Sequence, residues 1–151
     1  MPSPSDIARW IREEHAKAHD LIGQMTERLA VIPRANIAPW LQELKTQFER
    51  FRAHMQQHFA LEEEGGYLTS VLQIRPALQA EVDHFMVEHR QLAEVMTSIN
   101  AEVADLEAGQ SLHIRDACAR IRNLINMVEQ HEDHENMLVS HVFTQDMGSH
   151  D

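Results

Sequence analysis

The chain of 151 residues carries 24 acidic against 13 basic side chains, a formal net charge of −11 near pH 7. This excess of negative charge repels phosphate backbones and anionic lipid, so we expect neither nucleic acid nor a membrane as a partner. The length fits one domain that can bury a core without disulfide or metal staples. We therefore predict a single domain over residues 1–151, with a core over residues 5–144 and a polar C-terminal tail over residues 145–151.

A single cysteine, Cys118, excludes an intrachain disulfide, and we expect it to have a structural role. No apolar stretch is long enough for a signal peptide or a membrane span. These features predict a cytoplasmic protein, either a monomer or a homodimer.

The first half of the chain predicts a helical hairpin. Glycine and proline number only five each, and apolar residues recur at helical spacing in long blocks, which favours an all-helical protein. Ser5-Asp6 opens a first helix that Pro33 closes, and Asn36 opens a second that runs to Gly65-Gly66.

The second half predicts another helix pair. After a short connecting stretch over residues 67–75, Pro76 suits the first turn of a third helix that reaches about Glu107. Ser111 caps a fourth helix that runs through about Phe143. Because short connections join antiparallel neighbours, the predicted fold class is all-α, an up-down-up-down antiparallel four-helix bundle.

Two matching half-patterns of histidine and glutamate lie on the apolar faces of these predicted helices. In each half, one histidine is followed 43 or 42 residues later by a His-x-x-x-Glu pair. The six residues are His15, His58 and Glu62 in the first half, and His89, His131 and Glu135 in the second. Because residues four apart share one helix face, four helices can aim all six side chains at one point.

Both glutamates of this pattern lie on core-facing stripes without a lysine or arginine. A buried carboxylate costs several kcal/mol when it has no partner, so the pair needs a cation. Imidazole and carboxylate donors suit iron, zinc or manganese, whereas the lack of a second cysteine argues against thiolate sites. Two ions fit better than one, each with two histidines, with both glutamates bridging and one position left for a small ligand. Without metal, we expect both glutamates to show raised pKa values.

The pattern resembles the hemerythrin-like, or HHE cation-binding, domain family, in which a histidine and then His-x-x-x-Glu occur twice. The resemblance spans residues 5–147 and rests on the order and spacing of four strings. They are Arg12-Glu-Glu-His15, His58-Phe-Ala-Leu-Glu62-Glu63, Val87-Glu-His89-Arg90 and His131-Glu-Asp-His-Glu135-Asn136. It implies a non-haem centre of two iron ions with an oxo or hydroxo bridge, the four histidines as terminal ligands, and Glu62 and Glu135 as bridges.

The chain differs from the oxygen-carrying members of that family, which have five histidines and an aspartate bridge on the fourth helix. Here His89 stands alone on the third predicted helix face, and Glu135 takes the place of the aspartate. These departures count against dedicated oxygen storage and favour redox or gas-sensing chemistry.

Residues and resemblance together predict a di-iron protein that binds or reduces O2, NO or H2O2 in a sensing, iron-handling or stress-response role. Zinc or manganese are the substitutes that the same donors accept. One alternative is a peroxidase-like or iron-centre repair enzyme that acts on peroxide or NO. The other is a redox-inert metal-binding or regulatory module.

Three further side chains leave alternatives open. His19 lies one turn from His15 on nearly the same face, so it competes for that ligand position. His54 lies one turn before His58, and we expect a surface residue, with support of a metal ligand as the alternative. Tyr67 is expected to pack near a bundle end or to line an access path.

Overall fold

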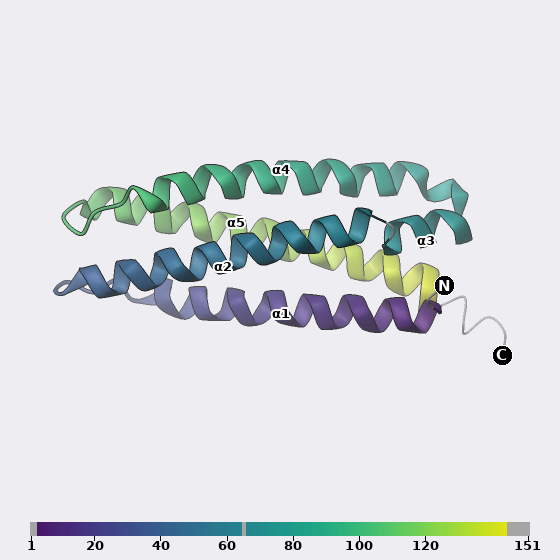
Figure 1. Ribbon diagram of the computed structural model, residues 1–151, viewed down its shortest axis with the longest axis horizontal. Helices are drawn as coiled ribbons and strands as arrows, with labels where there is room; N and C mark the ends of the chain where they lie inside the picture. The colour runs from purple at the N-terminus through teal and green to yellow at the C-terminus, as the bar shows by residue number, and fades with distance from the viewer. Residues whose placement is uncertain (1–2, 65, 145–151) are drawn as a thin grey trace.

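Four long helices form an antiparallel bundle in the computed structural model, which describes residues 3–64 and 66–144 (Figure 1). They are α1 (Pro4–Ala30), α2 (Ile37–Glu63), α4 (Gln79–Ala104) and α5 (Ser111–Val139). Each helix packs beside its neighbours in the order α1, α2, α4, α5 and back to α1. The predicted all-α four-helix bundle is therefore confirmed, while Gly65 and the predicted tail lie outside the described residues.

The segment after α2 differs from the prediction, because it forms a helix of its own, α3 (Tyr67–Ile74). Pro76 does not begin a long helix either. It starts a short 3-10 turn, η1 (Pro76–Leu78), which leads into α4. After the last long helix of the chain, α5 continues into a π-helical turn, η2 (Ser140–Thr144). The bundle thus carries an extra helical layer at the end where α3 and η2 lie.

Several helix ends differ from the predicted ones by a few residues, for reasons visible in their caps. Helix α1 begins after Ser3 and not at Ser5, because the Ser3 hydroxyl accepts from the Asp6 N–H while the Ser3 N–H donates to the Asp6 carboxylate. Asn36 does precede α2 as predicted, but it acts through its left-handed backbone, with φ of 54°, and not through its side chain.

Gly66 allows α3 to fold back tightly against the end of α2. A Cβ atom at this position would lie 2.1 Å from the carbonyl oxygen of Leu61 and 2.7 Å from that of Glu62. No side chain fits at such distances. The turn brings the next residue, Tyr67, into the bundle interior, where it is 1% exposed.

The apolar core consists of two clusters with a polar layer between them. On α1, residues 7–11 belong to the smaller cluster and residues 18–29 to the larger one, so His15 lies between the two. Along α5 and η2, the larger cluster covers residues 114–128 and the smaller one residues 138–143. The smaller cluster includes apolar side chains of α3, which close this end of the bundle above the polar layer.

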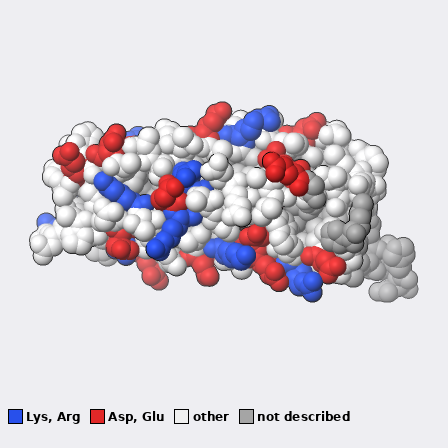
Figure 2. Space-filling view, viewed as in Figure 1, with Lys and Arg blue, Asp and Glu red and all other residues white. Residues whose placement is uncertain are grey.

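None of the described helices is both long and apolar enough to span a bilayer. On the face drawn in Figure 2, acidic and basic side chains are interspersed. Arg52 with Glu49, for example, forms a surface pair on α2 at 2.6 Å. Exposed pairs of this kind contribute little to stability. The buried layer of polar side chains is the unusual feature of this fold.

We predict that Gly66→Ala destabilises the protein by about 1–3 kcal/mol, because the added methyl group overlaps backbone atoms that cannot move independently. Thermal unfolding followed by circular dichroism measures the effect. Gly23→Ala is the matched control: it lies inside α1, where an added Cβ meets nothing within 4 Å. That substitution should stabilise the helix by about 0.5–1 kcal/mol. Equal midpoints for the two variants would contradict the proposed close approach.

Candidate metal centre

All six side chains singled out by the sequence pattern lie in the buried layer, and none is more than 4% exposed. His15 comes from α1, His58 and Glu62 from α2, His89 from α4, and His131 and Glu135 from α5. The choice between the two histidines of α1 is also clear in the structure. The side chain of His19 is 58% exposed, so His15 is the one that belongs to the layer.

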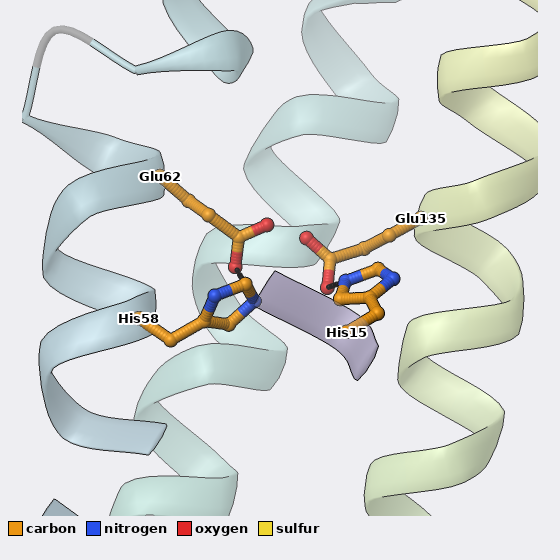
Figure 3. A group of neighbouring side chains, drawn as sticks. All are labelled: His15, His58, Glu62 and Glu135. Atoms are coloured by element: carbon orange, nitrogen blue, oxygen red, sulfur yellow. Dashed lines mark ion pairs between the residues drawn. The ribbon is translucent and has the colours of Figure 1, made fainter. Parts of the chain in front are cut away.

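The six side chains form two groups of four that share both glutamates. One group joins His15 and His58 to Glu62 and Glu135, and Figure 3 shows these side chains turned toward one another from α1, α2 and α5. The other group joins His89 and His131 to the same two glutamates. Within each group, one nitrogen or oxygen atom of every residue lies within 4.8 Å of those of the others. Two cations that share two carboxylates need this arrangement.

Several atoms in the layer have no hydrogen-bond partner among the described residues. They are Nε2 of His15, Nε2 of His58, both carboxylate oxygens of Glu62, and Oε1 of Glu135. His58 Nε2 and Glu62 Oε1 approach to 3.0 Å, but without hydrogen-bond geometry. A buried polar atom without a partner costs about 1–3 kcal/mol. Metal ions between the two glutamates would satisfy these atoms together, so the residues fit a metal.

The sequence model of the hemerythrin HHE cation binding domain matches residues 6–142, nearly the whole chain. The chain belongs to this family. No curated protein matches it, and no solved structure does. Family membership and the two donor groups agree on a hemerythrin-like metal-binding domain.

The two central glutamates of this hemerythrin-like domain have pKa values that move in opposite directions. Burial, together with the charge of Glu135, raises the pKa of Glu62 well above its ordinary value. Burial acts the same way on Glu135, but close polar contacts with Glu62, His131 and His15 outweigh it and lower the pKa of Glu135 well below its ordinary value. The prediction that both values rise is therefore wrong for Glu135. In the metal-free protein, these directions favour a proton on Glu62 over one on Glu135.

Burial keeps two of the imidazoles neutral. It lowers the pKa of His58 to about 3 and also lowers that of His89. For His15 and His131, burial acts in the same direction, but contacts with Glu135 outweigh it and raise the pKa. Neutral imidazole is the form that binds a metal, so His58 and His89 are ready for a cation at any pH near neutrality.

Side chains outside the layer hold the second ring nitrogen of three of the four histidines. The Nδ1 contacts are His89 with Glu63 at 2.9 Å, His131 with Glu88 at 2.6 Å, and His15 with Asn136 at 2.9 Å. Nδ1 of His58 has no such partner among the described residues, and its ring stacks on Trp10 at 6.2 Å. Two carboxylates therefore support the His89 and His131 half, whereas a neutral amide and a stacked ring support the other half.

Tyr67 takes part in the site more directly than its sequence position indicated. Its hydroxyl donates to Oε2 of Glu135, and burial raises the pKa of Tyr67 well above its ordinary value. Its outer side also lines a surface cleft of about 630 Å³ together with Trp10. Tyr67 thus lies between solvent and Glu135. The signal that the sequence offered is its position directly after Gly66, where the chain reverses.

Two other residues also differ from expectation. His54, expected at the surface, has a side chain only 18% exposed and stacks on His58 at 6.1 Å. Glu132, which the sequence analysis did not single out, is 1% exposed, and neither carboxylate oxygen has a hydrogen-bond partner among the described residues. The only sequence feature that could have indicated Glu132 is its position directly after His131.

We predict that Glu132→Gln stabilises the metal-free protein above pH 7 by about 2–3 kcal/mol and changes little below pH 4.5. Burial raises the pKa of Glu132 from 4.5 to about 7, so the folded chain keeps a proton that the unfolded chain has released. The stability that this proton contributes is complete below 4.5 and disappears as the pH rises through 7. Glutamine has no such loss.

Urea unfolding of both proteins between about pH 4 and pH 8 measures this difference. Asp133→Asn, at an exposed neighbouring position on α5, is the control and should give a difference that does not depend on pH. A pH-independent effect of Glu132→Gln would show that its carboxylate ionises normally in the folded chain.

Proposed function

We propose that this domain binds two iron ions in the buried layer and uses them to bind or reduce a small ligand such as O2, NO or H2O2. The proposed ligands are His15 and His58 for one ion, His89 and His131 for the other, and Glu62 and Glu135 for both. The observation that carries the proposal is the pair of donor groups that share both glutamates. Two ions with common carboxylates explain why two acidic side chains lie at 0% exposure in an apolar bundle.

The donor set supports iron, with zinc or manganese as substitutes. Imidazole and carboxylate suit all three metals, and no cysteine lies in either donor group. Cys118 is buried in the larger apolar cluster instead, as expected for a structural residue. Iron would supply the electrons and the open coordination position that O2, NO or peroxide requires.

The residues around the layer hold its ligands in place and exclude water. Phe59 stacks on His89 with ring centroids 4.2 Å apart, and Phe85 packs edge-on against His131 at 5.6 Å. The hydroxyl of Tyr67 orients Glu135 and stays protonated near neutral pH. A layer closed by apolar clusters on both sides admits diatomic ligands or peroxide more readily than larger molecules.

The role that we favour is sensing, iron handling or a stress response, with binding preferred over turnover. Each donor group contains two histidines, and His89 is the only member that comes from α4. The two groups thus contain four histidines, whereas the oxygen carriers described above have five. Peroxide turnover by the iron-loaded protein would favour the enzyme alternative, and stoichiometric oxidation without turnover would favour binding.

Metal analysis combined with an absorption spectrum tests the proposal. We expect about two iron ions per chain, from two donor groups, and the near-ultraviolet absorption of ferric iron, which zinc lacks. A protein that takes up only zinc, or a single ion, would contradict a di-iron function.

We predict that His58→Ala and His131→Ala each lose at least one of the two metal ions, because each removes half of the imidazoles of one donor group. The iron content of each purified variant measures the loss. His113→Ala is the control, since His113 is exposed on α5 and belongs to neither group. Two ions retained in both site variants would exclude these histidines as ligands.

We also predict that Glu88→Gln weakens metal binding by about 10- to 100-fold, because the Glu88 carboxylate supports His131 through Nδ1 at 2.6 Å. Competition against a chelator of known affinity measures this change. Glu94→Gln, at an exposed position of the same helix, should leave the affinity unchanged. An equal affinity for both variants would exclude Glu88 as a supporting residue.

A further inference from the structure

A third buried carboxylate, Glu132, lies outside the proposed set of ligands. It follows His131 on α5, and its Oε2 lies 3.4 Å from Nε2 of His19 on α1. Both of its oxygens are buried and lack a hydrogen-bond partner among the described residues. A carboxylate in this situation is costly unless a cation or a proton joins it.

The contact between Glu132 and His19 has the spacing of two ligands on one ion. Metal–nitrogen and metal–oxygen distances in protein sites are about 2.0–2.2 Å, so two donors at an angle of roughly 90–110° lie about 3.0–3.4 Å apart. The observed separation of 3.4 Å is within this range, and the pair does not form a hydrogen bond. The exposed imidazole and the buried carboxylate can therefore hold one divalent cation between them.

One member of this pair, His19, lines a cleft of about 610 Å³ between α1 and the C-terminal end of α5. Its lining includes His15, His19 and Asn136, and Asn136 holds Nδ1 of His15 at 2.9 Å. His19 is exposed, whereas His15 is a buried member of the first donor group. Arg12 also lines the cleft, one turn before His15, so a cation is favoured at the opposite end, beside His19.

A similar His–Glu pair lies on α4, but both oxygens of its carboxylate have partners. His84 is 63% exposed on its side chain, and its Nε2 lies 2.9 Å from Oε2 of Glu88. The other oxygen of Glu88 contacts Nδ1 of His131 at 2.6 Å. Because both oxygens of Glu88 are already engaged by imidazoles, this pair lacks a free ligand for a passing cation.

We infer that Glu132 and His19 form an accessory cation site through which divalent metal ions reach the buried layer. His19 binds the ion at the surface, Glu132 holds it out of solvent, and His15 receives it as the first ligand of the layer. This inference rests on the proposed function only in requiring that the layer takes up a divalent cation. The accessory site affects how fast the layer fills and not how many ions it holds.

Stopped-flow absorbance of Co²⁺ uptake by the metal-free protein tests the inference. We expect Glu132→Gln and His19→Gln each to slow uptake by about tenfold, the lower end of what a charged cleft adds to an association rate. The final number of Co²⁺ ions per chain should equal that of the unchanged protein. Glutamine is close in size to both side chains, and His19 is exposed, so both variants should fold.

His113→Gln is the control, because it removes an exposed histidine of α5 that belongs to neither donor group. Its uptake rate should be unchanged. Unchanged rates for Glu132→Gln or His19→Gln, or a slower rate for His113→Gln alone, would overturn the accessory site. Fewer bound ions in Glu132→Gln would place Glu132 in the main centre and also overturn it. If the unchanged protein takes up no Co²⁺, the proposed metal function fails as well.

Discussion

Two carboxylates buried side by side in the middle of an apolar helix bundle are the constraint on which this molecule depends. Glu62 and Glu135 are fully inaccessible, and two like charges cannot both persist there without a counter-charge. In the metal-free chain, the conflict is resolved by a proton on Glu62 and by imidazole contacts on Glu135. The same layer can exchange that proton for metal ions, which links metal binding to protonation and to stability.

The backbone supports this layer at a position where the chain reverses. Gly66 permits the close approach of α3 to α2, and the reversal delivers Tyr67 to the carboxylate of Glu135. The apolar residues of α3 then close one end of the bundle. The lack of a side chain at Gly66 therefore allows α3 to cover the polar layer. Exclusion of water strengthens the electrostatic interactions inside this layer.

The repeated histidine and glutamate pattern is symmetric in sequence, but its surroundings are not. Carboxylates support His89 and His131, whereas an amide supports His15, and His58 relies on stacked rings. The half that contains His15 also faces the cleft in which we infer the accessory site. The two halves of the layer therefore have the same donor types but different surroundings.

The sequence by itself predicted the four long helices and the six residues of the buried layer, because helical periodicity and four-residue spacing are local properties of the chain. The tertiary structure excluded the alternative to His15 on α1, because it leaves the side chain of His19 58% exposed. It also decided the contact of Tyr67 with Glu135, the burial of Glu132 and the opposite pKa shifts of the two central glutamates. Each of these depends on distances between segments far apart in the chain, which local patterns do not encode.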